Sequence, residues 1–199
     1  MKILLIGASG TLGQAVDREL APRHEIVRIG HSSGEFQVDI GDSASIRALF
    51  ERTGRFDALV SATGSVHFGA LAEMNEEHYA IGLNNKLMGQ VNLLLIGREY
   101  ANDGASFTLT SGVLSHDPIR FGSSASMVNA ALEGFARSAA LELPRGLRIN
   151  VVSPTVLQES MGTYAPYFRG FKPVSAAEAA LAYARSVEGA QTGQTYQVP

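Results

Sequence analysis

Short apolar runs and longer amphipathic segments alternate along the chain. The short runs, at residues 3–6, 26–29, 58–60, 106–110 and 148–152, have the composition typical of β-strands. Between and after them, apolar residues recur with helical periodicity at residues 12–20, 43–52, 76–100, 124–142 and 176–188. Because alternating strands and helices are joined by right-handed crossovers, the pattern predicts an α/β fold with a parallel sheet covered on both faces.

Length and composition favour a single domain over residues 1–199. The 199 residues are 45% hydrophobic and 18% charged, which is enough apolar material for one core. One segment, residues 159–174, is irregular, because Gly and Pro are spread among Tyr164, Tyr167, Phe168 and Phe171. It predicts a small lid at the edge of the sheet, and the alternative is a loop that only packs on the surface.

Charge and cysteine content narrow the possible partners. The formal net charge is −3 without a block of like charge, so the basic surface of a nucleic-acid-binding protein is missing. No cysteine is present, which excludes thiolate metal sites and is compatible with the cytoplasm, and no His/Asp/Glu cluster has metal-ligand spacing. The first apolar run is too short to span a membrane and lacks a signal-peptide cleavage pattern. We expect a cytoplasmic protein without a metal, a nucleic acid or a membrane as partner.

A glycine-rich turn follows the first predicted strand and opens the first predicted helix. Its sequence is Gly-Ala-Ser-Gly-Thr-Leu-Gly over residues 7–13. Glycines let the backbone approach a pyrophosphate, and the N–H groups and dipole of the following helix attract the negative charge. Strand, turn and helix in this order predict a dinucleotide site.

The end of the second strand bears on the choice of dinucleotide. An NAD site usually places an acid there for the ribose 2′-hydroxyl, and the acid would repel a 2′-phosphate. Here no acid precedes Glu35, and Arg28 lies nearby. The sequence therefore predicts NADP(H) rather than NAD(H), with a polar turn that contacts nothing as the alternative. The phosphate cradle would consist of His31, Ser32 and Ser33.

Six further stretches resemble the short-chain dehydrogenase/reductase family over nearly the whole chain, in the order that the family has them. They are Asp39-Ile40, Ser61-Ala-Thr-Gly64, Leu109-Thr-Ser111, Asn129-Ala-Ala-Leu-Glu-Gly-Phe135, Arg148-Ile-Asn-Val-Val-Ser-Pro154 and the tail at residues 192–198. The resemblance implies a three-layer Rossmann fold with a doubly wound, mostly parallel seven-stranded sheet. In relatives the helices matching residues 76–100 and 124–142 form a four-helix bundle, so we expect a homodimer or homotetramer.

The resemblance also assigns cofactor contacts. The glycine turn would hold the pyrophosphate, Asp39 and Ile40 the adenine, residues 62–64 the ribose, and Pro154 and Val156 the nicotinamide. The implied cofactor residues outside the phosphate cradle are Gly7, Ser9, Gly10, Thr11, Leu12, Gly13, Asp39, Ile40, Ala62, Thr63, Gly64, Pro154 and Val156.

The catalytic pattern of the family is broken. Relatives use a Tyr as proton donor or acceptor and a Lys one helical turn later, so that both lie on one helix face. The alignment places Ala125 at the Tyr position and Asn129 at the Lys position, and neither can ionise. Ser111 matches the family's catalytic Ser, although its separation from position 125 is one residue longer than usual.

A second departure suggests a compensation. Lys86 stands three residues before Gly89, where relatives have an Asn that lies near the catalytic Lys. We hypothesise that the two groups have exchanged places and that Lys86 supplies the cation, with a solvent-facing lysine as the alternative. The proton donor is left open between His116, because histidine commonly acts as a general acid, and His67, Tyr164 or Tyr167.

Two functions follow from the sequence. The first is an NADP(H)-dependent oxidoreductase that reduces a small carbonyl or oxidises an alcohol with a rearranged proton relay based on Ser111, Lys86, Asn129 and His116. The second is a catalytically silent NADP(H)-binding protein that acts as a regulator or sensor.

Overall fold

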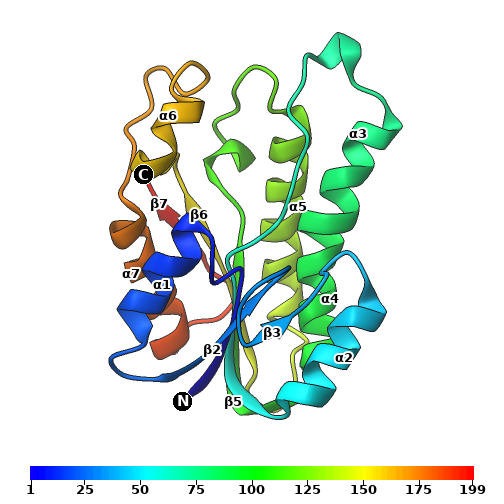
Figure 1. Cartoon of the computed structure of the whole chain (residues 1–199), viewed down its shortest axis with the longest axis vertical. Coiled ribbons are helices and arrows are strands. Elements are labelled where there is room, and N and C mark those ends of the chain that lie inside the picture. The colour runs from blue at the N-terminus through cyan, green and yellow to red at the C-terminus, as the bar shows by residue number, and fades with distance from the viewer.

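A seven-stranded sheet forms the middle layer of the computed structural model, which describes all residues from Met1 to Pro199 (Figure 1). The strand order is β3-β2-β1-β4-β5-β6-β7, and all six strand pairings are parallel. The predicted Rossmann-type α/β class is therefore confirmed. The strands are β1 (Lys2–Ile6), β2 (Glu25–Gly30), β3 (Phe36–Gln37), β4 (Phe56–Ser61), β5 (Ala101–Thr110), β6 (Arg148–Pro154) and β7 (Thr195–Val198).

Helices cover both faces of the sheet (Figure 1). The helices α1 (Thr11–Leu20) and α7 (Ala176–Glu188) pack on one face, and α2 (Ser43–Thr53), α4 (Met88–Gly97) and α5 (Ser123–Ala139) pack on the other. The shorter helices are η1 (Leu71–Glu73), α3 (Glu76–Ile81), the π-helix η2 (Gly82–Leu87), η3 (Val113–Ser115), η4 (Gln158–Ser160) and α6 (Met161–Tyr164). No helix is both long and apolar enough to cross a bilayer.

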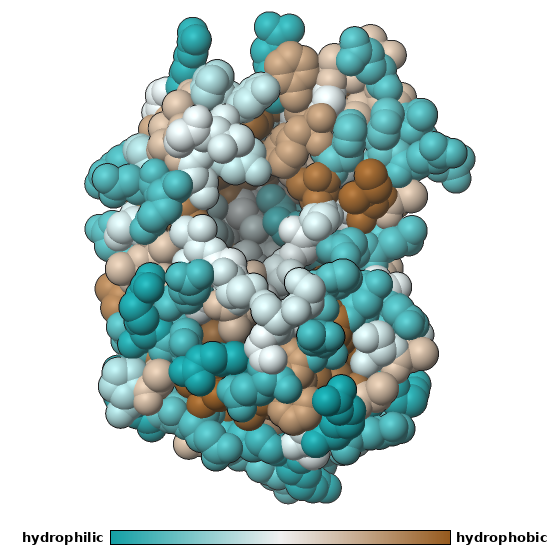
Figure 2. Space-filling view, in the orientation of Figure 1, coloured by the Kyte–Doolittle hydropathy of each residue, from teal (hydrophilic) through white to brown (hydrophobic).

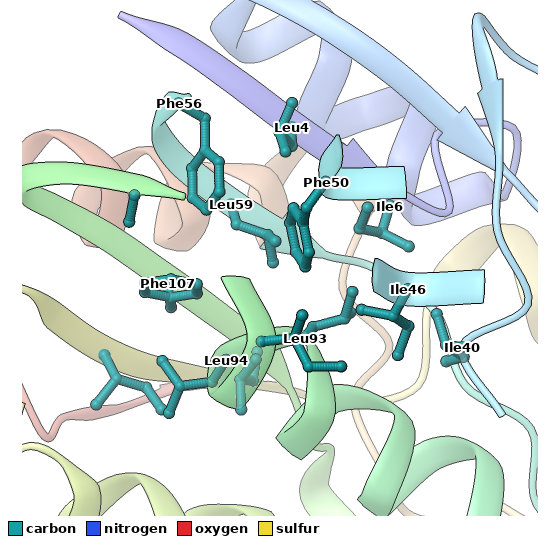
Figure 3. Close-up of a cluster of buried hydrophobic side chains, with 14 of the residues drawn as sticks. Leu4, Ile6, Ile40, Ile46, Phe50, Phe56, Leu59, Leu93, Leu94 and Phe107 are labelled. Atoms are coloured by element: carbon teal, nitrogen blue, oxygen red, sulfur yellow. The ribbon is translucent and has the colours of Figure 1, made fainter. Parts of the chain in front are cut away.

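The core has one apolar layer on each side of the sheet. Along β1, Leu4 and Ile6 belong to the layer under α2 and α4, whereas Ile3 and Leu5 belong to the layer under α1 and α7. Side chains alternate between the two faces of a strand, and a parallel sheet covered on both faces needs apolar residues at every position. This explains the unbroken apolar run at the start of the sequence. Figure 3 shows the first layer around Leu4, Phe50 and Phe107.

Several element boundaries differ from the sequence prediction, and two of the differences have a clear physical reason. The helix expected over residues 76–100 is divided into α3, the π-helix η2 and α4, and it ends at Gly97. A π-turn adds about one residue to a single turn, which the average apolar spacing of a long segment does not reveal. The strand expected over residues 106–110 begins earlier, at Ala101. The sequence prediction missed its first half because that half carries Asn102 and Asp103 and lacks the apolar signal.

The segment predicted as a lid lies between β6 and α7. It contains η4 and α6 and is closed at its base by a parallel bridge between Leu157 and Val174. The rings of Phe168 and Phe171 pack edge to face with centroids 5.2 Å apart. Phe168 and Phe171, two of the four aromatic residues that marked this segment in the sequence, therefore form its internal packing, whereas Tyr167 contacts Phe121 outside it.

Candidate active site at the carboxyl edge of the sheet

The loop between β1 and α1 forms a narrow glycine turn. Gly7 has a φ of +84°, and a Cβ there would lie 2.5 Å from the carbonyl oxygen of Ala62. A Cβ at Gly13 would overlap the carbonyl oxygen of Gly7, so the first turn of α1 packs directly on the loop. No side chain caps the first turn of α1, which leaves its N–H groups free for an anion. The other predicted pyrophosphate residues, Ser9, Gly10, Thr11 and Leu12, lie in the same turn.

A cavity of about 140 Å³ adjoins the glycine turn. Asp39 and Ile40 line it as the sequence predicts, and one carboxylate oxygen of Asp39 accepts a hydrogen bond from the backbone N–H of Gly41 at 2.8 Å. Ser32 and Ser33 are exposed in the turn that follows β2. The predicted cofactor residues that line this cavity are Gly7, His31, Asp39, Ile40 and Thr63.

Arg28 is engaged elsewhere. Its guanidinium donates to both carboxylate oxygens of Asp17, at 2.9 Å each, and lies 3.7 Å from the carboxylate of Glu35. These acids raise the pKa of Arg28, with the Asp17 hydrogen bond as the largest cause. The side chain that the sequence placed near the predicted phosphate cradle is therefore committed to an ion pair, which leaves His31, Ser32 and Ser33 as the predicted cradle residues.

Lys86 extends from η2 across the loop that follows β4. A Cβ at Gly64 would lie 2.6 Å from Cγ of Lys86, so the lysine stem fills the space beside this glycine. The Lys86 ammonium donates to the carbonyl oxygen of Ser111 at 3.3 Å, and no carboxylate lies within 4.0 Å of it. Although the residue keeps some exposed surface, its ammonium lies deep in the protein, and this burial lowers the pKa of Lys86 to about 8.

Gln90 ties η2 and α4 to the end of β5. Its Nε2 donates to the carbonyl oxygens of Lys86 and Thr110, at 3.1 and 3.0 Å, and its Oε1 accepts from the N–H of Thr110 at 2.8 Å. The amide thus replaces a neighbouring strand beyond the end of β4. Sequence reasoning missed this residue, and the available signal was a glutamine within an otherwise apolar helix segment. Since Thr110 precedes Ser111, Gln90 fixes the backbone on both sides of the Lys86–Ser111 contact.

Asn129, on α5, lies beside the same loop and is only 3% exposed. Its Nδ2 donates to the carbonyl oxygen of Gly112 at 3.4 Å, and its Oδ1 is buried without a hydrogen-bond partner. Lys86 and Asn129 therefore contact the carbonyl groups of consecutive residues. Both line a cleft of about 250 Å³, and we call it the lysine cleft. Its predicted lining residues are Gly64, Lys86, Ser111, Asn129, Pro154 and Val156.

The hydroxyl expected to act from Ser111 has another partner. Ser111 Oγ donates to a carboxylate oxygen of Glu133 at 2.8 Å. A Cβ at Gly112 would instead lie 3.2 Å from Nδ2 of Asn129, so position 112 is the one that faces Asn129. Position 112 also has the usual family separation from Ala125, which accounts for the extra residue counted from Ser111. The Ser111–Glu133 bond was not foreseen from the sequence.

The candidate proton donors lie in different places. His116 is exposed and lines a neighbouring cavity of about 280 Å³, which shares Val113 and Thr155 with the lysine cleft. His67 stacks on the ring of His78, with centroids 4.1 Å apart. Tyr167 faces Phe121, whereas Tyr164 lines the lysine cleft. Of these four, only Tyr164 therefore shares a cleft with Lys86.

A second cavity, of about 380 Å³, adjoins the lysine cleft and shares Phe68 and Tyr164 with it. We call it the aromatic vestibule, and no charged side chain lines it. Figure 2 shows the molecule hollowed above the carboxyl ends of the strands, with apolar side chains on the rim. An uncharged, apolar molecule suits this lining best, because burying a charge without a partner is costly. The side chains of the vestibule are Phe68, Ile119, Phe121, Thr163, Tyr164 and Tyr167.

Solved structures share this architecture over the whole chain. The protein lin1944 from Listeria innocua is 52% identical and superposes with a TM-score of 0.99, with 100% of both chains covered. A small-chain dehydrogenase is 25% identical with a TM-score of 0.85, over 100% of this chain and 95% of that one. A small-chain dehydrogenase in complex with NADPH is 23% identical with a TM-score of 0.88, over 100% and 96%, and this likeness concerns the fold.

Sequence relatives point to the same group of proteins. An uncharacterized oxidoreductase from Methylorubrum extorquens is 26% identical over 175 residues, which are 76% of this chain and 71% of that protein. The 2,3-dihydro-2,3-dihydroxybenzoate dehydrogenase of Escherichia coli K12 is 32% identical over 125 residues, 59% of this chain but only 50% of that enzyme. A family model described as enoyl-(acyl carrier protein) reductase matches residues 11–196. The chain belongs to the short-chain dehydrogenase/reductase family of oxidoreductases.

Proposed function

We propose that this protein is an NADP(H)-dependent oxidoreductase that acts on a small carbonyl or alcohol and uses a proton relay built around Lys86. One observation carries the proposal. Lys86 and Asn129 contact the carbonyl groups of Ser111 and Gly112 in a cleft at the carboxyl edge of the sheet. In an open parallel α/β sheet this edge is where ligands bind.

The glycine turn fits a dinucleotide. A side chain at Gly7 would clash with the loop after β4 and one at Gly13 with the turn itself, so glycine is required for this tight turn, and the uncapped start of α1 offers free N–H groups. Asp39 and Ile40 would hold the adenine, and Pro154 and Val156 would flank the nicotinamide. When bound, the nicotinamide supplies or accepts a hydride.

The turn after β2 favours the phosphorylated cofactor. His31, Ser32 and Ser33 are exposed there, and the nearby carboxylate of Glu35 accepts a hydrogen bond from the backbone N–H of Arg28 at 3.1 Å. A 2′-phosphate would therefore meet hydroxyl groups and an imidazole. The proposed preference is NADP(H) over NAD(H).

Lys86 would provide the positive charge that relatives take from α5. Its ammonium has no acidic partner, so its charge is available to ribose hydroxyls and to a developing oxyanion. Asn129 would contribute an amide in its place. The aromatic vestibule beside the lysine cleft supports an apolar carbonyl compound as substrate.

Titrations with NADPH and NADH, together with one variant and its control, test the cofactor assignment. Nicotinamide fluorescence should report micromolar NADPH binding and weaker NADH binding. His31→Asp should reduce NADPH affinity about tenfold and leave NADH affinity within threefold, because the new carboxylate would repel only the 2′-phosphate. His116→Asp, which alters an exposed histidine that does not line the cavity beside the glycine turn, is the matched control and should change neither affinity. If neither nucleotide binds, the proposal is refuted.

A second function follows from the missing hydroxyl groups. Ala125 stands at the position of the family Tyr, Gly112 faces Asn129 without a hydroxyl group, and the Ser111 hydroxyl is bound to Glu133. These features support a silent NADP(H)-binding protein that acts as a regulator or sensor. NADPH absorbance with a panel of aldehydes, ketones and quinones separates the two functions, since complete inertness beside tight binding favours the silent protein.

We also propose that the protein forms a homodimer or homotetramer through α4 and α5. A groove of about 210 Å³ runs between these helices, lined by Leu95 and Phe135, and Leu95 is 40% exposed. Light scattering tests this proposal, because Leu95→Glu should shift the mass toward that of a monomer. A wild-type mass of one chain refutes it.

A further inference from the structure

The lysine cleft lacks the usual source of a proton. Carbonyl reduction needs one proton on oxygen for each hydride on carbon, and Ala125 has none to give. The Ser111 hydroxyl donates to Glu133, and the Asn129 amide does not ionise near neutral pH. The proton must therefore come from another group that lines this cleft.

Two titratable side chains line the cleft, Lys86 and Tyr164. Tyr164 belongs to α6 at the rim, is 36% exposed and has no hydrogen bond or ion pair to a cation that would make its phenol more acidic. Lys86 instead lies at the base of the cleft, with its stem against Gly64. Position therefore favours Lys86 as the source.

The Lys86 ammonium has donors to spare. It carries three N–H groups, and the chain provides one acceptor, the carbonyl oxygen of Ser111 at 3.3 Å. Oδ1 of Asn129, which accepts no hydrogen bond from the chain, is a second buried acceptor beside the same loop. Since no carboxylate holds the ammonium, a donor remains for a substrate oxygen in the cleft.

We propose that the Lys86 ammonium is itself the proton donor to the substrate oxygen, in place of the missing tyrosine. This inference rests on the proposed function. As the carbonyl carbon gains a hydride, an N–H bond of Lys86 breaks and an O–H bond forms, which leaves an alcohol and a neutral amine. The amine then takes a proton from water. In the oxidative direction the neutral amine accepts the proton of the alcohol.

Burial makes this transfer feasible near neutral pH. An ordinary lysine holds its proton too tightly to be an efficient acid, whereas burial lowers the pKa of Lys86 to about 8. Gln90 acts as a positioning residue, because it binds the carbonyl oxygen of Lys86 and both backbone groups of Thr110. It thereby sets the distance between the ammonium and the loop at Ser111.

Lys86→Arg separates proton donation from the positive charge alone. Arginine keeps the charge but does not release its proton in this pH range. We expect NADPH affinity within threefold of the wild type and a loss of at least 100-fold in kcat, the usual scale for removing a general acid. Lys86→Met removes both the charge and the proton, so this variant should lose both NADPH affinity and kcat. If Lys86→Arg keeps kcat within threefold and the same pH profile, the inference is overturned.

Competitive labelling gives a readout that does not depend on turnover. The chain has three lysines, Lys2, Lys86 and Lys172, so mass spectrometry of acetylated peptides resolves each one. In the free protein, Lys86 should titrate near pH 8. Titration of Lys86 near the ordinary lysine value of about 10.4 overturns the inference. If the wild type binds NADPH but reduces no substrate, the proposed function fails as well, whereas an active Lys86→Arg variant refutes only the proton donor.

Discussion

Replacing Gln90 by leucine tests whether its side-chain amide holds the candidate site together. Gln90 is fully buried, and its amide makes three hydrogen bonds to main-chain groups, two of them with Thr110. Leucine has a similar volume and no polar atom. Gln90→Leu therefore leaves the N–H and the carbonyl oxygen of Thr110 buried without these partners.

The cost follows from those two groups. A buried polar group that loses its partner costs about 1–3 kcal/mol, and the added apolar surface offsets part of this. We expect a loss of about 3 kcal/mol in the free energy of unfolding, in line with the larger single-site effects. For a chain of this size that corresponds to a fall of about 10 °C in Tm.

Urea unfolding followed by circular dichroism, at one fixed protein concentration, measures the change. Gln194→Leu is the matched control, because Gln194 is exposed and its side chain makes one hydrogen bond, to the carbonyl oxygen of Thr192 at 2.9 Å. It should change the free energy by less than about 0.5 kcal/mol. A loss below about 1 kcal/mol for Gln90→Leu, with an unchanged denaturant slope, would refute the bridging role of the amide.

Three further predictions test the turn, the buried lysine and the core. Gly13→Ala should weaken NADPH binding at least tenfold, because its Cβ would overlap the carbonyl oxygen of Gly7. In the control variant Gly162→Ala, the new Cβ meets no atom within 4 Å, so this variant should bind NADPH as the wild type does. Equal NADPH affinities of the two variants in a fluorescence titration would contradict the prediction. Lys86→Met should be more stable than the wild type below pH 8, and this difference in stability should shrink as the pH rises from about 8 to 10.5. In that range the folded protein holds the amine neutral while the unfolded chain still binds the proton. A pH-independent difference in urea unfolding would argue against a buried charge. Tyr183→Phe should lower the free energy of unfolding by about 1 kcal/mol, because the buried phenol loses its hydrogen bond of 2.6 Å with Thr110 of β5. Burial raises the pKa of Tyr183, so an ultraviolet titration in which it ionises together with the exposed tyrosines would be inconsistent with its place in the core.

The sequence predicted the fold because the sheet is buried on both faces. A strand such as β1 must then be apolar throughout, and the amphipathic segments between strands can only be covering helices. The same logic misses elements without an apolar signal. The first half of β5 carries Asn102 and Asp103, and β3 has two residues, so neither was predicted from the pattern.

The candidate site was predictable only in part. The glycine turn is local, because residues 7–13 carry the whole requirement for backbone close to a phosphate. The partners of Ser111 and Arg28 are not local. Ser111 bonds to Glu133 of α5 and Arg28 to Asp17 of α1, and neither pairing follows from spacing along one element.

What the sequence determined by itself was the order of the elements, the parallel sheet and the glycine turn, since each depends on periodicity or on neighbouring residues. The surroundings of Lys86 depended on the tertiary structure. Its stem lies on Gly64, its ammonium on the carbonyl of Ser111, and its backbone is held by Gln90. Whether a lysine is solvated or desolvated depends on what other segments place around it, and burial is what lowers its pKa.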